Sequence, residues 1–146
     1  MSAEENKALV RRFIEEVINE GNMATIEELV DPDWVDHDPS SPEEIRGIEG
    51  AKQFYGDFRS AFPDIQVTIE EQVAEGDKVV TLWTFRGTHQ GELGGMPASG
   101  NQVTVKGMSM DRISGGKFVE TWDNYDALGM MQQIGAVPSP EQQAQA

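Results

Sequence analysis

The sequence contains no cysteine in its 146 residues, and it has few basic residues. The absence of cysteine excludes disulfides, thiol nucleophiles and thiolate metal sites, and it is compatible with a reducing compartment. Lys and Arg number 11 against 26 Asp and Glu, so the formal net charge is −15. Because eleven cations among so many carboxylates do not readily form a basic stripe, nucleic acid and anionic membranes are poor partners.

Long apolar runs are also missing. No uninterrupted apolar stretch is long enough to span a bilayer, and the N-terminal segment lacks a basic region followed by an apolar run. We therefore expect a cytoplasmic protein. The length fits one domain with a real core, since a chain of this size buries roughly 70% of its unfolded surface. We expect this domain over residues 1–137 and a flexible polar tail over residues 138–146.

The first part of the chain shows helical periodicity. Ser2 and Glu5 have the spacing of a capping box, and apolar residues then recur at helical intervals. A shorter apolar pattern before Pro32 indicates a second helix, and residues 34–37 read as a short extended piece. A third apolar stripe, broken by Pro63, indicates a third helix.

After Pro63 the apolar period changes from 3.6 to 2, which is typical of strands. A turn at residues 75–77 predicts one hairpin, and a Gly-rich turn between residues 102–113 and 117–125 predicts another. A last helix is expected at about residues 126–134. Helices first and an antiparallel sheet afterwards predict an α+β fold.

Hairpin geometry predicts which side chains share a face of this sheet. Centring the last turn on Gly115 places Asp123 opposite Gly107, and Thr121 opposite Ser109. These residues then lie on one face.

Extending this register through the longer loop adds Trp83 and Phe85 to the face of Asp123, which gives an aromatic surface around a carboxylate. The other face then carries Met108, Met110, Phe118 and Trp122. One set of helices covers one face of a sheet, so we expect a homodimer packed through the other, outer face.

Five segments in this order match a known family: NKALVRRFIEEVINEGN, PDWVDHDP, FPDIQVTIE, GDKVVTLWTFRGTHQGEL and GGKFVETWDNYDALGMMQQIGA. Together they resemble the SnoaL-like polyketide cyclases (ester cyclases) of the NTF2-like superfamily, over residues 6–137. The resemblance implies a cone, in which three N-terminal helices pack on a curved antiparallel sheet followed by a short C-terminal helix. Such a cone encloses an apolar pocket.

The resemblance also implies a chemistry. Characterised members close a ring of an aromatic polyketide methyl ester by aldol condensation, with a carboxylate on the last strand and no cofactor. Asp123 is therefore expected to be the general base, with a small hydrophobic molecule as the partner and no cofactor. Burial beside aromatic side chains would raise its pKa from the reference of about 3.9 toward a useful range.

The enolate formed by such a base needs a hydrogen-bond donor. The known cyclases place a histidine on the neighbouring strand, where this chain has Gly107 and Ser109. We expect His37 and His89 to be catalytic in its place, with Asn124 and Tyr55 as alternatives. The expected pocket lining is Trp34, Tyr55, Phe58, Trp83, Phe85, Gly107, Ser109, Thr121 and Tyr125.

Two other functions stay open. In a binding module without chemistry, Asp123 would only orient a polar ligand group. In an epoxide hydrolase of the limonene type, Asp111 and an arginine would join Asp123 around a water molecule. We expect no metal at the Asp36-His37-Asp38 segment, because adjacent residues of an extended segment point apart.

Overall fold

The computed structural model describes residues 2–39 and 41–138. Its helices are α1 (Ala3–Phe13), the π-helical turn η1 (Ile14–Asn19), α2 (Ala24–Leu29), α3 (Gly47–Ala61) and α4 (Ala127–Gln133). Its strands are β1 (Val30–His37), β2 (Ile45–Arg46), β3 (Gln66–Glu75), β4 (Lys78–Thr88), β5 (Gln102–Ser114) and β6 (Lys117–Tyr125). The α+β order of elements is as predicted. The expected flexible tail lies outside the described residues, apart from Pro138.

The first helix begins at the predicted capping box. The Glu5 backbone N–H donates to the Ser2 hydroxyl at 3.1 Å, and the Ser2 N–H donates to the Glu5 carboxylate at 3.1 Å. The helix then widens into η1, which ends at Asn19. The Asn19 side chain exchanges two hydrogen bonds with the backbone of Val67, at 3.1 and 2.7 Å. This contact fixes the end of the helix to strand β3.

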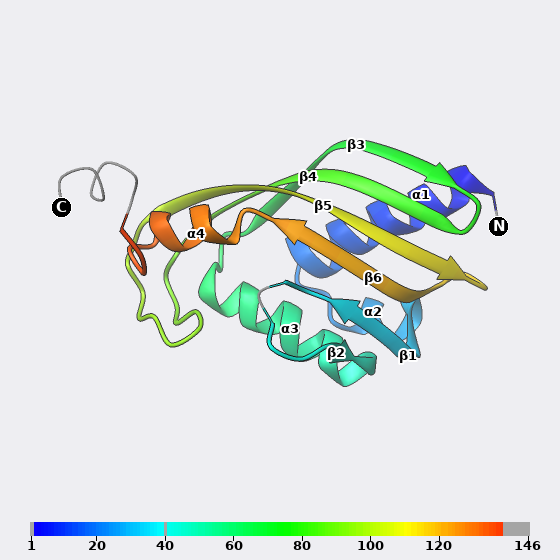
Figure 1. The fold of residues 1–146 in the computed structure, drawn as a ribbon. Coiled ribbons are helices and arrows are strands. Elements are labelled where there is room, and N and C mark those ends of the chain that lie inside the picture. Colours follow the sequence, from blue (N-terminus) through cyan, green and yellow to red (C-terminus); the bar gives the residue numbers. More distant parts are fainter. Residues whose placement is uncertain (1, 40, 139–146) are drawn as a thin grey trace.

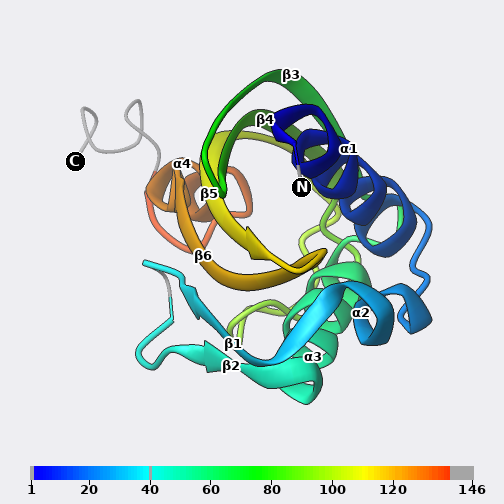
Figure 2. The same cartoon turned by 90° about the vertical axis from the view of Figure 1, so that its right-hand side faces the viewer.

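The six strands in the described residues form one sheet in the order β2-β1-β6-β5-β4-β3. Strands β3 to β6 are antiparallel neighbours, as the hairpins predict. Strand β1 joins the sheet by pairing parallel to β6, so a segment from the helical half of the chain borders the last strand. The sheet is curved, and helices α1 to α3 lie on its concave side (Figures 1 and 2).

The register between β5 and β6 differs from the predicted one. Ser109 lies opposite Asp123, and Gly107 lies opposite Tyr125. The predicted partners of Asp123 and Thr121 were therefore wrong by two residues, although a shift of two keeps each side chain on the predicted face.

Two features together produce this shift: the turn is centred between Gly115 and Gly116 instead of on Gly115, and a β-bulge adds one residue. Arg112 pairs with Glu120 while Ile113 pairs with Phe118, so Val119 is an extra residue on β6. One extra residue inverts the alternation of side chains. Phe118 therefore packs on the concave side, at 4% exposure and with its ring 5.0 Å from that of Phe13. The prediction of Phe118 on the outer face was wrong for this reason.

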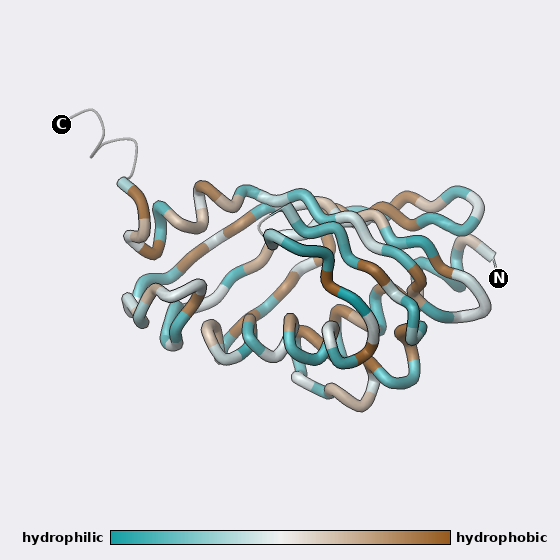
Figure 3. The backbone as a smooth tube through the Cα atoms, turned by 60° about the horizontal axis from the view of Figure 1, so that its bottom comes forward, coloured by the Kyte–Doolittle hydropathy of each residue, from teal (hydrophilic) through white to brown (hydrophobic). Residues whose placement is uncertain are grey.

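Apolar side chains fill the space between the sheet and the helices. Apolar and polar residues alternate along the long strands, as the brown and teal segments of the tube show (Figure 3). One cluster lies beneath α1, η1 and α2, and a second lies where the ends of α3 and α4 meet β4 and β5. Within residues 2–39 and 41–138, none of the helices combines the length and apolar character needed to cross a bilayer.

Candidate active site

A cavity of about 130 Å³ lies between the concave face of the sheet and the helices. Most of its lining is apolar or aromatic, and this composition is typical of sites for hydrophobic small molecules. From the set expected on sequence grounds, it is lined by Trp34, Tyr55, Phe58, Trp83, Phe85, Ser109, Thr121 and Tyr125. Three carboxylates also line it: Asp38, Asp111 and Asp123.

Asp123 enters this cavity from β6 and is held by a chain of hydrogen bonds. The Ser109 hydroxyl donates to its Oδ1 at 2.6 Å, and the Trp83 indole N–H donates to the Ser109 hydroxyl at 2.9 Å. Burial raises the pKa of Asp123, and the hydrogen bond from Ser109 offsets part of that rise. Asp123 is thus a stronger base than an ordinary surface carboxylate.

A second chain of the same kind lies beside the first. The Trp34 indole N–H donates to the Thr121 hydroxyl at 3.0 Å, and that hydroxyl donates to Asp111 at 2.7 Å. Burial raises the pKa of Asp111 to about 7, against the lowering effect of the Thr121 hydrogen bond. The cavity wall therefore carries two oriented carboxyl groups, each supported by an indole and a hydroxyl.

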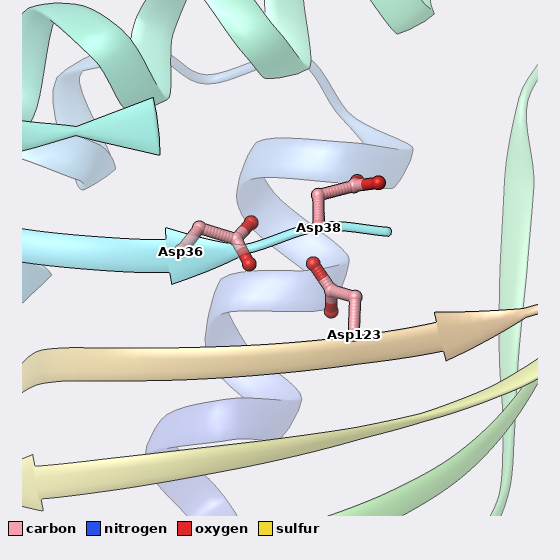
Figure 4. A group of neighbouring side chains, drawn as sticks. All are labelled: Asp36, Asp38 and Asp123. Carbon is pink, nitrogen blue, oxygen red and sulfur yellow. The ribbon is translucent and has the colours of Figure 1, made fainter. Parts of the chain in front are cut away.

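Asp36 and Asp38 bring two more carboxyl groups to Asp123. One oxygen of each lies within 4.8 Å of those of the other two (Figure 4). Asp36 is 0% exposed, and its pKa is raised well above the ordinary value, first by burial and then by the neighbouring Asp123. In the described part of the chain, these three are the side chains grouped closely enough to hold a cation.

Sequence reasoning missed this cluster. It compared adjacent residues, which point apart on a strand, whereas Trp34, Asp36 and Asp38 are two residues apart and share a face. The spacing is a signal in the sequence. The sequence pattern contains no such signal for the parallel pairing of β1 with β6, which brings this face to Asp123.

The two histidines lie elsewhere. The His37 ring stacks on Trp122 with 5.4 Å between centroids, and its Nε2 is 2.8 Å from the Glu120 carboxylate. His89 is 0% exposed, and its Nδ1 accepts from the Ser99 backbone N–H at 3.1 Å. In the described residues, neither histidine lines the cavity.

His37 does reach a second hollow of about 330 Å³ next to the cavity. Asn124 and the residues that follow β1 line this hollow too, and so do Asp38 and Asp123. Asp38 and Asp123 line both spaces, so these two residues lie between the cavity and the hollow.

Gly107 has a different role from the expected one. It does not appear among the described residues that line the cavity. A Cβ at this position would lie 2.7 Å from the Trp83 ring and 2.7 Å from the Cβ of Tyr125. Gly107 therefore gives space to the Trp83 ring, which lies across it.

Two tyrosine side chains lie near the carboxyl groups of the cavity. Tyr55 lines the cavity from α3, and burial beside the aspartates raises its pKa well above 10.0, so it stays a donor at neutral pH. The Tyr125 hydroxyl donates to Asp38 at 3.3 Å. Arg59 also lines the cavity, but its guanidinium donates to the backbone carbonyls of Ile18 and Asn19.

Comparison with known proteins places the chain among cyclase-like sequences and structures. The sequence profile described as SnoaL-like polyketide cyclase matches residues 8–134. The aklanonic acid methyl ester cyclase DnrD of Streptomyces peucetius is 31% identical over 141 residues, which cover 91% of this chain and 93% of DnrD.

Solved structures are similar over nearly the whole chain. A candidate SnoaL-like polyketide cyclase from Jannaschia sp. CCS1 superposes with a TM-score of 0.85 at 27% identity, covering 93% of this chain and 95% of its own. TsrD from Streptomyces laurentii superposes with a TM-score of 0.83 at 31% identity, covering 94% and 99% respectively.

Proposed function

Because the chain belongs to the SnoaL-like polyketide cyclase family, we propose that it closes a ring in a hydrophobic carbonyl compound by aldol condensation, with Asp123 as the general base. One observation carries the proposal above all. Asp123 is a desolvated carboxylate, oriented by Ser109 and Trp83, on the wall of a cavity with a mostly apolar lining. A base in such surroundings suits a carbon acid whose proton lies between two carbonyl groups.

In the proposed reaction, the proton that the base removes from the substrate returns to the product. Asp123 takes the proton from the substrate carbon, and the electron pair of the C–H bond forms an enolate. The enolate carbon attacks a second carbonyl of the same molecule, which forms the C–C bond and an alkoxide. Asp123 then returns the proton to the alkoxide oxygen. The aromatic walls would hold the two carbon atoms close together, which lowers the entropic part of the barrier.

Tyr55 is the proposed hydrogen-bond donor to the enolate oxygen. It lines the cavity with Asp123, and its raised pKa keeps the hydroxyl protonated at neutral pH. Loss of one such donor typically lowers kcat by about 100-fold or more. We therefore expect a decrease of that order in Tyr55→Phe, measured by turnover. Turnover at the wild-type rate in Tyr55→Phe would show that another group donates the hydrogen bond to the enolate oxygen.

The charges around the cavity support an uncharged substrate. Asp38, Asp111 and Asp123 line it, while the guanidinium of Arg59 is engaged by backbone carbonyls. A free acid would meet these carboxylates without a compensating cation, whereas its methyl ester would not. We propose a neutral ester, a class to which the substrate named for DnrD belongs.

The test is turnover of aklanonic acid methyl ester and a panel of related polyketide esters by the purified chain. We expect Asp123→Asn to lower kcat by at least about 100-fold, since it removes the base and keeps the side-chain shape. Asp33→Asn, the same substitution at an exposed position of β1, is the matched control and should retain wild-type kcat. Unchanged turnover in Asp123→Asn would refute the role of this carboxylate.

The alternatives predict other outcomes of the same assay. Tight binding of an ester without turnover would identify a binding module. Hydrolysis of a terpenoid epoxide would support the limonene type of hydrolase. The latter needs an arginine beside Asp111 and Asp123, and the arginine that lines the cavity, Arg59, is bound at the end of η1. The geometry therefore favours cyclisation.

A further inference from the structure

We propose that Asp36 is a positioning residue that shares one proton with Asp123 and, by donating an O–H hydrogen bond, keeps the Asp123 carboxylate ionised and directed into the cavity. The proposal rests on the proposed function, in which Asp123 is the base. Asp36 itself lies behind the site, since it lines neither of the two hollows in the described residues.

The parallel pairing of β1 with β6 brings the two carboxyl groups together. Asp36 lies opposite Thr121, so its side chain shares the concave face with Asp123, two residues further along β6. The carboxyl groups of Asp36 and Asp123 face each other (Figure 4), and one oxygen of Asp36 lies within 4.8 Å of an oxygen of Asp123. A hydrogen bond between two carboxyl groups requires a proton on one of them.

The surroundings of Asp36 favour its neutral form. Within residues 2–39 and 41–138, neither of its buried oxygens accepts a hydrogen bond from an N–H or O–H group. The titratable groups that face it are Asp123 on β6, Asp38 after its own strand, Asp111 on β5 and Tyr55 on α3. All of these are acids, so an ionised Asp36 would be a buried charge without a cation.

The two carboxyl groups differ in what stabilises their charge. Asp123 accepts the Ser109 hydroxyl and faces the cavity, whereas Asp36 is wholly enclosed. Two buried carboxyl groups this close together do not both ionise at neutral pH, so one proton stays with the pair. It resides on Asp36, which donates to Asp123. Hydrogen bonds from the Asp36 carboxyl group and the Ser109 hydroxyl then lower the pKa of Asp123 against the effect of burial. They also fix the orientation of the Asp123 carboxylate.

The first test needs no substrate. Aspartate labelled with ¹³C at the carboxyl carbon reports the ionisation of each side chain by NMR, with Asp36→Asn used to assign the signal of Asp36. We expect Asp36 to remain protonated throughout the neutral range while Asp123 is ionised. An ionised Asp36 at pH 7 would overturn the proposal, whatever reaction the protein catalyses.

The second test compares two variants through the pH dependence of kcat/KM on the ester. Asp36→Asn keeps a donor next to Asp123, whereas Asp36→Leu removes it. We expect the acidic limb, which reports ionisation of the base, to move up by at least about one pH unit in Asp36→Leu and by less than about half a unit in Asp36→Asn. Rescue by the conservative variant distinguishes a donor from a space-filling role.

Other results of this comparison would overturn the proposal. If Asp36 were ionised, Asp36→Asn would remove a like charge, and the limb would move down. If the residue only filled space, the limb would stay in place in both variants. Circular dichroism and thermal unfolding confirm that each variant is folded. If Asp36→Leu does not fold, the direction of the shift in Asp36→Asn and the NMR titration still decide.

A cation is the competing explanation for three clustered carboxyl groups. Hard divalent cations take oxygen ligands, so Mg²⁺, Ca²⁺ and Mn²⁺ are titrated separately into the labelled protein. We expect no saturable change in the signal of Asp36. Displacement of the Asp36 proton by any of these ions would overturn the proposal that Asp36 and Asp123 share a proton. Failure of the proposed function has a different signature, namely undiminished turnover in Asp123→Asn.

Discussion

Asp64 and Asp111 carry the same carboxyl group, yet their surroundings shift its pKa in opposite directions. Asp64 is exposed and accepts both the backbone N–H and the hydroxyl of Thr88 at 2.7 Å, and these two bonds lower its pKa. Asp111 is buried with one hydroxyl donor, and burial raises its pKa to about 7. The local dielectric and the number of donors decide the outcome for each residue.

Asp111→Asn is predicted to change how stability depends on pH. The folded pKa of Asp111, about 7, lies above its ordinary 3.8, so its stabilising contribution is complete below pH 3.8 and is lost as the pH rises through 7. Asparagine cannot ionise and can still accept the Thr121 hydroxyl. We expect the variant to be more stable than the wild type by about 1 to 2 kcal/mol at pH 5, and by at most about 4 kcal/mol at pH 8.

Urea unfolding at pH 5, 6, 7 and 8 measures this effect. Asp33→Asn is the control, because an exposed aspartate should leave the slope of unfolding free energy against pH as in the wild type. A variant less stable than the wild type at pH 8 would contradict a buried, titrating Asp111.

Gly107→Ala is predicted to be destabilising without directly touching the cavity. The new Cβ would lie 2.7 Å from both the Trp83 ring and the Cβ of Tyr125. Relief of such overpacking costs about 1 to 3 kcal/mol and would pull the Trp83 indole away from Ser109. We expect a lower unfolding free energy and altered tryptophan fluorescence. A variant that matched the wild type in both would show that Trp83 moves freely.

Among the structural elements, η1 and β3 depend on one asparagine. Strand β3 is at the edge of the sheet, so one side of its backbone has no strand partner in the described residues. The side chain of Asn19 satisfies both backbone groups of Val67 from the end of η1. At the same helix end, the backbone carbonyls of Ile18 and Asn19 accept hydrogen bonds from the guanidinium of Arg59. One turn of helix thereby ties α3 and the sheet edge together.

Asn19→Ala should weaken this connection. The Val67 N–H and C=O would each lose a partner, at a combined cost of about 1 to 3 kcal/mol. Thermal unfolding and hydrogen exchange of the Val67 amide measure the loss, and the amide should exchange faster. Gln53→Ala, at an exposed position of α3, is the control and should change neither quantity. Unaltered exchange in Asn19→Ala would refute the role of this contact.

At the scale of the whole molecule, the two faces of the sheet have different neighbours. Helices α1 to α3 cover the concave face (Figure 2). On the outer face, Met108 is 53% exposed and lies beside Leu82, which is 39% exposed. Exposed apolar neighbours on an uncovered sheet face favour contact with another surface.

We predict a homodimer through this outer face. Sedimentation equilibrium at micromolar concentration should give twice the mass of the chain, and Met108→Asp should shift the equilibrium toward monomer, because it places a charge in the contact. Leu128→Asp is the control, since Leu128 is an exposed apolar residue of α4 and not of the sheet. A monomeric wild type, or equal dissociation by both variants, would contradict the prediction.

Much of the fold and part of the candidate site could be predicted from local pattern. Helical and strand periods differ, so the N-terminal helices, the hairpins and the α+β order follow from residues close together in the chain. The capping box at Ser2 and the concave position of Asp123 are of this kind. The resemblance to the cyclases rests on the same segments.

The rest depended on contacts between distant segments. A bulge at Val119 moved Phe118 to the concave side, and the sequence does not mark that extra residue. The pairing of β1 with β6 joined Asp36 to Asp123, which are far apart in the chain. Sequence alone thus determined most of the elements and the face of the sheet on which Asp123 lies, because periodicity is local. Tertiary structure decided which carboxyl groups surround Asp123, because burial and the approach of carboxyl groups arise only when distant strands pair.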